Sequence, residues 1–198
     1  MFDTSLFLSS GFLNAEDTLA QGGFAGLAGV PGDLGNIARI GRERALNLSK
    51  LATGTCYAGL YQKVQFKSSS TAAPAKGGAL FWYDRANFIV TPDGSVASEA
   101  DFAGVGLMAN TKGYFGVIQI AGKASALFRA SVTAKTQGCL VVQLTTTNTF
   151  DSIAEATGSY ISGGTLGIKN IVGASLEAPQ DSGVNLISLR PINLNIKA

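Results

Sequence analysis

The chain has 198 residues, of which only 14% are charged, and its formal net charge is +2. It contains no histidine, which excludes histidine-based acid–base catalysis, activation of a Ser or Cys nucleophile by histidine, and most zinc sites. No apolar run approaches the ~20 residues that a membrane-spanning helix needs, so we expect no membrane partner. Low charge together with 25 glycines is more typical of an assembly subunit than of a free enzyme, and we predict no catalytic residue.

Residues 1–54 differ in composition from the rest of the chain, and we predict that they form an extended N-terminal arm. Their Gly/Ala-rich stretch, residues 22–35, contains the helix-breaking pair Pro31-Gly32. Beyond it, apolar residues recur with rough helical spacing and Asp33 is suited to cap a helix, which predicts a short helix at 34–48. We expect no independent hydrophobic core in this arm.

Strand patterns dominate from Thr55 onward, and residues 55–198 are predicted to form one body. A turn is predicted at 91–94 and a long loop at 145–164. Eight to ten short strands without intervening helices predict an all-β fold, a single β-barrel or jelly-roll-like sandwich. The predicted strands lie at 60–66, 79–83, 87–90, 102–109, 114–122, 125–132, 139–144, 171–177, 184–189 and 192–196.

The predicted hairpin at 101–126 contains two glycine patterns that imitate nucleotide-binding loops. Gly104–Ala109 fits the fingerprint G-x-G-x-x-A, but a turn follows in place of a helix, and no acidic residue occurs between Asp101 and Asp151. Residues 116–124 have five residues between the glycines where a Walker A loop has four, and Ala where Mg²⁺ needs Ser or Thr. We therefore expect no cofactor, and we interpret the glycines as positions of close packing within strands.

Three other groups of residues allow alternative interpretations. The aromatic triplet 81–83 could form a carbohydrate-binding platform, although alternate aromatics in a strand more often pack in a core. The acidic residues within 93–101 lack the ligand spacing of a calcium loop, so we expect no metal site. Cys56 and Cys139 are expected to be free thiols, and a disulfide between them stays open.

Positive charge is concentrated between residues 39 and 76, where seven Lys/Arg residues occur with one acid, Glu43, for a net charge of +6. Such a basic arm on a mildly acidic body could bind an acidic protein surface. The alternative interpretation is that these side chains are simply solvated. Nucleic-acid binding needs denser charge with interleaved aromatics, so we expect no nucleic-acid partner. The predicted contact residues of the arm are Arg39, Arg42, Arg44 and Lys50.

Several segments of the body follow one another in an order that occurs in a known family. They are GALFW at 78–82, ANFIVT at 86–91, FAGV at 102–105, KGYFGVIQIAG at 112–122 and IVGASLEA at 171–178. This order resembles the capsid decoration (cement) proteins of tailed bacteriophages, over roughly residues 55–190. It contains no catalytic signature.

The resemblance implies a β-barrel or jelly-roll-like body on the outer capsid surface of the virion, usually as a homo-oligomer that clamps neighbouring major capsid protein subunits. We expect a structural virion protein, with the major capsid protein and copies of itself as partners, a trimer being favoured over a dimer. Residues 22–35 and 39–50 suit an arm that orders on the capsid, with strand addition as one mode. The alternative is a receptor- or carbohydrate-binding head domain of a phage fibre, served by residues 81–83 and 145–164. A third hypothesis is an enzyme, and the only chemistry that the sequence leaves possible for it is based on a pair of carboxylates.

Overall fold

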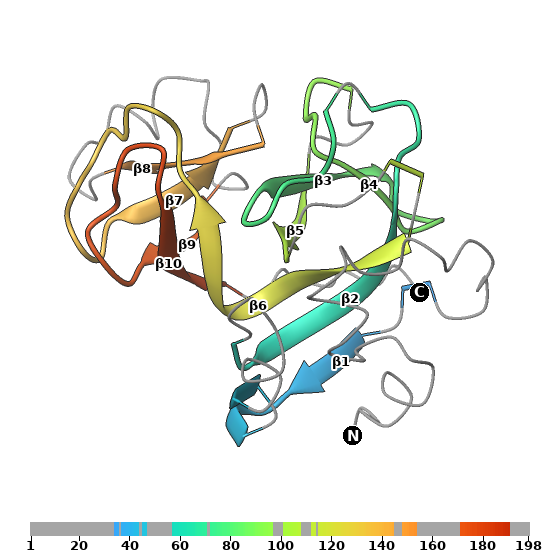
Figure 1. Ribbon diagram of the computed structural model, residues 1–198, viewed down its shortest axis with the longest axis horizontal. Helices are drawn as coiled ribbons and strands as arrows, with labels where there is room; N and C mark the ends of the chain where they lie inside the picture. The colour runs from blue at the N-terminus through green and yellow to red at the C-terminus, as the bar shows by residue number, and fades with distance from the viewer. Residues whose placement is uncertain are drawn as a thin grey trace.

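The computed structural model describes residues 34–35, 37–43, 45–46, 57–70, 72–96, 101–107, 112–113, 115–144, 148–153 and 171–190. These residues form a nearly all-β structure, which confirms the predicted fold class. The hydrogen-bonded strands of Figure 1 are β1 (Ile37–Ile40), β2 (Gly59–Phe66), β3 (Ala79–Asp84), β4 (Ile89–Thr91), β5 (Phe102–Gly106), β6 (Phe115–Leu127), β7 (Leu140–Gln143), β8 (Phe150–Ile153), β9 (Ile171–Ser175) and β10 (Val184–Leu189).

A closed barrel forms from β2, β4, β3, β5 and the first half of β6. Its strands pair in that order, and β6 pairs back to β2 from Gln65↔Phe115 to Gly59↔Gly122, which closes the ring. The β2–β4 pair is parallel and the other pairs are antiparallel. Because successive residues of a strand face opposite sides, alternate side chains fill the interior. The core of this barrel consists of Val64, Phe66, Leu80, Trp82, Val90, Ala103, Ile118 and Ile120.

A second ring of strands shares β6 with the barrel. The C-terminal half of β6 pairs with β10, and the sheet continues through β9 and β7 to β8 (Figure 1, left). A parallel bridge, Phe128↔Phe150, links β8 back to the end of β6. The second core lies against the outward side chains of β3 and β5, since Phe81 and Phe102 pack with Phe150 and Ile187. One long strand therefore belongs to both halves of the molecule.

β6 passes from the barrel to the second ring at Gly122, where its pairing with β2 ends and its pairing with β10 begins. The φ of this glycine, +96°, lies in the left-handed region, and a Cβ at this position would lie 2.6 Å from the carbonyl oxygen of Ala58. Only glycine adopts this conformation without strain and permits this approach. The sequence predicts two separate strands at 114–122 and 125–132, whereas the structure has one continuous strand that ends at Leu127.

Most of the predicted strands are confirmed, including the strand at 184–189 with identical bounds. The predicted hairpin is confirmed in its pairing, since Val105 lies opposite Gln119 and Gly106 opposite Ile118. The uninterrupted loop predicted at 145–164 is wrong for Phe150–Ile153, which form β8. These four residues are buried because β8 pairs with β7 and contributes Phe150 to the second core. The strand predicted at 192–196 lies outside the described residues.

The helix predicted at 34–48 is only partly correct. Residues 37–40 form β1, which pairs with β2 from Ile37↔Gln62 to Ile40↔Gly59. Burial explains the difference, because Ile37 packs against the barrel core and Ile40 is only 3% exposed. Helical backbone occurs at residues 42–43 and 45–46, where the amide of Ala45 donates to the carbonyl of Gly41 at 3.0 Å. Part of the predicted arm is thus a strand of the sheet.

Candidate functional site

The edge strand β1 is the part of the described structure where the predicted contact residues can be examined. It hydrogen-bonds to β2 along one side, and no second strand pairs with it within the residues that the structure describes. A strand with one open side offers its outward N–H and C=O groups to another extended segment. The position of β1 therefore suits strand addition by a partner.

The turn before β1 is fixed to the barrel by backbone contacts. The amide of Gly35 donates to the carbonyl of Lys63 at 2.9 Å, and Gln62 Nε2 donates to the carbonyl of Gly35 at 3.2 Å. Gly35 has a φ of +84°, so the turn uses a left-handed residue. These bonds and the burial of Ile40 fix the position of β1 against β2.

Two of the four predicted contact residues lie at this edge. Arg39 is exposed on β1, and Arg42 is exposed on the helical residues that follow. Arg44 and Lys50 lie outside the described residues. Two exposed arginines therefore lie beside the open edge together with exposed Glu43, so the described residues 39–43 have a net charge of +1 (two Arg, one Glu).

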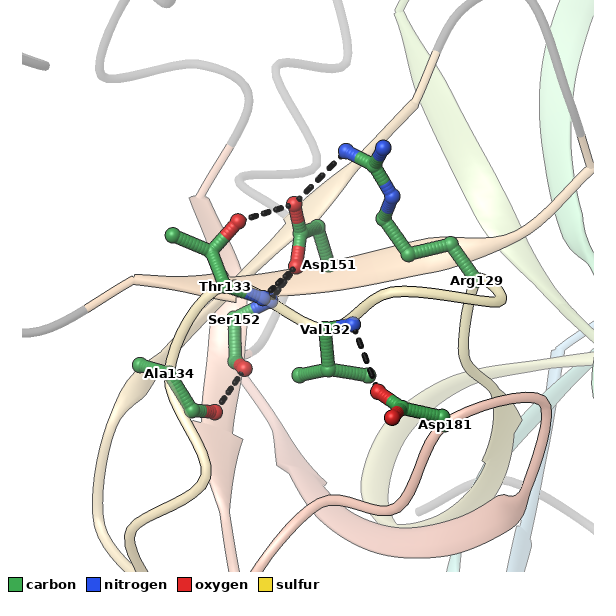
Figure 2. A network of polar contacts seen from close by, with 7 residues as sticks. All are labelled: Arg129, Val132, Thr133, Ala134, Asp151, Ser152 and Asp181. Carbon is green, nitrogen blue, oxygen red and sulfur yellow. Dashed lines mark hydrogen bonds and ion pairs between the residues drawn. The ribbon is translucent and has the colours of Figure 1, made fainter.

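A second polar site lies in the second ring, around Asp151 on β8 (Figure 2). The residue Asp151 is 5% exposed. Its Oδ1 accepts from the amides of Thr133 at 2.9 Å and Ser152 at 2.8 Å. Its Oδ2 accepts from Thr133 Oγ1 at 2.8 Å and Arg129 Nη1 at 3.1 Å. Both oxygens of this carboxylate thus accept two hydrogen bonds each, so protein donors occupy its acceptor positions.

Asp181, in the loop between β9 and β10, holds the same segment from the other side. Its Oδ1 accepts from the amide of Val132 at 2.8 Å, and its Oδ2 lies 2.5 Å from Lys135 Nζ. The hydrogen bond from Lys135, followed by that from Val132, lowers the pKa of the Asp181 carboxyl below its usual 3.8. Both aspartates therefore act as acceptors for one stretch of chain (Figure 2).

That stretch, residues 128–134, covers the open side of β8, and we call it the strap. The amide of Arg129 donates to the carbonyl of Phe150 at 2.9 Å, and the amide of Ala134 donates to the carbonyl of Ser152 at 3.0 Å. The Ser152 hydroxyl donates to the carbonyl of Ala134. The strap protects an otherwise open sheet edge, so the Asp151 and Asp181 network has a structural role. Sequence reasoning missed both aspartates because all their partners except Ser152 are 18 to 49 residues distant along the chain.

The glycine motifs of the predicted hairpin have structural roles. Gly104 and Gly106 lie inside β5, and a Cβ at Gly104 would lie 2.7 Å from the carbonyl oxygen of Gln119. At Gly106 a Cβ would lie 2.6 Å from the carbonyl oxygen of Ala75. The interpretation of these two glycines as packing positions is therefore confirmed.

The aromatic triplet 81–83 does not form an exposed platform. Phe81 is completely buried and Trp82 is 5% exposed, so both belong to the two cores. Tyr83 is partly exposed, and Lys67 Nζ lies 3.5 Å from the centre of its ring. Core packing, the alternative interpretation, is confirmed for Phe81 and Trp82.

The acidic residues within 93–101 have protein partners. Asp93 Oδ1 accepts from the amide and hydroxyl of Ser95, and Asp101 pairs with Arg85 at 3.3 Å. Glu99 lies outside the described residues. Across the described ranges, no three His, Cys, Asp or Glu side chains are grouped so that they could hold a metal ion.

Cys139 is buried, and its Sγ lies 3.1 Å from Ser175 Oγ. Cys56 lies outside the described residues, so the prediction of free thiols stays a prediction for the pair.

Among the described residues there is no helix of sufficient length and apolar character to cross a membrane. No protein-family model matches the chain, and a comparison with characterised proteins gives no match.

Proposed function

We propose that the chain is a structural virion protein, a non-enzymatic capsid decoration subunit that binds the outer surface of a phage capsid and stabilises contacts between major capsid protein subunits. The observation that carries the proposal is the open edge of β1, with Arg39 and Arg42 exposed beside it. Strand addition provides affinity through backbone hydrogen bonds and requires no reactive side chain. A subunit that binds as part of a repeating array needs only modest affinity at each position.

The resemblance of the body to cement proteins supports the same function. Its segments correspond to β3, β4, β5 and β6, which are four of the five barrel strands, and to β9 of the second ring. In this proposal the body is a rigid support, and the edge of β1 contacts an acidic surface of the major capsid protein. The boundary between arm and body at residue 54 stays a prediction, although β1 already belongs to the sheet.

The alternative, a receptor- or carbohydrate-binding head domain, also stays a prediction. Two of the three aromatics that favoured it, Phe81 and Trp82, are buried and unable to stack on a sugar in this structure. Tyr83 is the member of the triplet that keeps partial exposure. The structure therefore offers this alternative less support than it offers a contact at β1.

Co-sedimentation with capsids of the source phage tests the proposed function. The purified chain should pellet with the capsids in a saturable manner, at a fixed ratio to the major capsid protein. Failure of the unmodified protein to bind would contradict the decoration role. Images of native virions then distinguish density on the capsid lattice from density at a fibre tip.

Charge reversal tests the contact surface itself. The double variant R39E/R42E should lower the apparent affinity for capsids by at least about tenfold, because like charges at an interface oppose association. The matched control is R190E, an exposed arginine that follows β10 in the second ring. If R190E weakens binding as much as R39E/R42E, net charge and not the β1 edge determines binding.

A further inference from the structure

Phe88, in the turn between β3 and β4, has an unusual backbone conformation. Its φ is +54°, and within the described part of the chain it shares a positive φ with one other residue that is not glycine, Ser182. This conformation is a genuine outlier for a bulky side chain, because the Cβ atom crowds the following carbonyl group. Such residues persist only where the surrounding structure holds them, and they are concentrated at binding sites and switch regions.

Hydrogen bonds hold the Phe88 backbone in this conformation. The Asp84 carboxylate accepts from the backbone amide of Asn87 at 3.1 Å and from Nδ2 of the same residue at 2.8 Å. The amide of Phe88 donates to the carbonyl of Arg85 at 3.3 Å, which closes the turn. The carbonyl of Phe88 accepts from the amide of Gln65 at 3.0 Å, so the turn is also bound to β2.

The ring of Phe88 lies over Gly35, in the turn before β1. A Cβ at Gly35 would overlap the Cζ, Cε1 and Cε2 atoms of the ring, so the tip of the ring points at the glycine. The same ring lies 6.5 Å from the ring of Trp82 in an edge-on arrangement and packs against the barrel core. Phe88 therefore connects the barrel core with the turn that leads into β1.

Gly35 is also a point at which the chain is bound to β2. Its amide donates to the carbonyl of Lys63, and its carbonyl accepts from Gln62 Nε2. β1 begins two residues later, has four residues and pairs with β2 alone among the described strands. Because so short a strand with one partner is marginally stable, its position depends on the contacts at its ends.

We propose that Phe88 is a positioning residue for the open edge of β1. Its ring, held by the strained turn, keeps Gly35 and hence β1 fixed against the barrel. This inference rests on the proposed function, in which the edge of β1 contacts the capsid. An edge that is already ordered binds an added strand more tightly, since no conformational entropy is lost in ordering it. Phe88 acts through Gly35 and needs no contact with the partner.

Amide hydrogen exchange of the free full-length protein tests this role without any capsid. F88G removes the ring and fits the left-handed backbone, so it should lower the protection of the Gly35 amide and of the β1 amides by at least about tenfold. The amide of Ser175 in β9 is the internal reference, so that a change in global stability is not mistaken for loosening of β1. The matched control Y83A removes a partly exposed ring that lies against Lys67, and it should leave the protection of β1 unchanged.

A double variant tests the contact between the ring and the glycine. G35A places a Cβ where the ring lies, so it should lower the protection of β1 in the unmodified chain. In the F88G background the ring is absent, and G35A should lower the protection by a smaller factor. Equal factors in the two backgrounds would overturn the proposal, as would an F88G variant in which β1 stays fully protected.

Co-sedimentation with capsids separates this inference from the proposed function. F88G should bind capsids at least about tenfold more weakly than the unmodified protein, whereas Y83A should bind normally. If F88G loosens β1 without weakening the binding, the positioning role is wrong and the decoration function stands. If the unmodified chain does not bind, the decoration function is wrong, and the exchange measurements still decide whether Phe88 fixes β1.

Discussion

Arg129 Nη1 lies 3.1 Å from Oδ2 of Asp151, and this ion pair joins the strap to β8. The Arg129 side chain is 45% exposed, whereas the Asp151 side chain is only 7% exposed. The arginine therefore lies over the carboxylate at the surface, and the amides of Thr133 and Ser152 bind the same carboxylate from within. A buried carboxylate with several donors contributes more to stability than a surface ion pair does.

Replacement of Asp151 should destabilise the protein strongly. D151A removes the acceptor of two amides, one hydroxyl and one guanidinium, and we expect a loss of about 2–4 kcal/mol in the free energy of unfolding. R129A should cost about 1 kcal/mol or less, because it removes only the half-exposed partner. Urea denaturation measures both values. Equal losses for the two variants would show that the ion pair, and not the set of backbone donors, provides the stabilisation.

Asp181 should make stability depend on pH in acid. The pKa of its carboxyl is lowered in the folded protein, chiefly by Lys135, so its contribution is fully present above the usual value of 3.8 and is lost as the pH falls through the lower folded pKa. D181N should therefore have a lower thermal midpoint than the unmodified protein at neutral pH, and the difference should diminish below about pH 4.

The variant K135Q provides the matched comparison for Asp181. Because it removes the first cause of the lowered pKa, K135Q should also reduce the acid dependence of the midpoint. In the K135Q background, D181N should have a smaller effect than in the unmodified chain. A difference between D181N and the unmodified protein that stays constant from neutral to acid pH would contradict the assignment.

Gly104 should tolerate no side chain. A Cβ there would lie 2.7 Å from the carbonyl oxygen of Gln119, a backbone atom, so G104A should destabilise the protein by about 1–3 kcal/mol through overpacking. G41A is the matched control, because no atom lies within 4 Å of the corresponding Cβ position, and it should change stability by less than about 0.5 kcal/mol. Chemical denaturation measures both. A neutral G104A would show that β5 and β6 can separate without cost.

Replacement of Trp82 should lower the stability of the fold and should not act by removing a ligand contact. It is 5% exposed in the barrel core, where its ring lies 6.5 Å from that of Phe88 in an edge-on arrangement, so W82A should cost about 3–5 kcal/mol in the free energy of unfolding. Y83A, which changes a partly exposed ring, is the variant suited to test glycan binding. If W82A abolished binding to a glycan array without loss of stability, the fibre-head alternative would be favoured over the decoration role.

Local sequence pattern was sufficient to predict some of the strands and insufficient for others. Alternation along residues 60–66 located β2 correctly, because a period of two is a local property of a strand, although the predicted half-burial is wrong since residues 61–64 are all buried. The glycine positions in β5 were interpreted correctly since the surrounding residues have no helical pattern. By contrast, β1 and β8 are four residues each, too short for a clear period, and both depend on partners elsewhere in the chain.

The sequence by itself determined the all-β class, most of the strands, the lack of histidine chemistry and the concentration of basic residues near Arg39 and Arg42. Only the tertiary structure decided that β2 and β6 close a barrel, that β6 also belongs to a second ring, and that the strap is held by Asp151 and Asp181. It also decided that the ring of Phe88 lies over Gly35. The physical reason is that side-chain periodicity reports which residues of a strand are buried, whereas the choice of partner depends on contacts between residues distant in sequence.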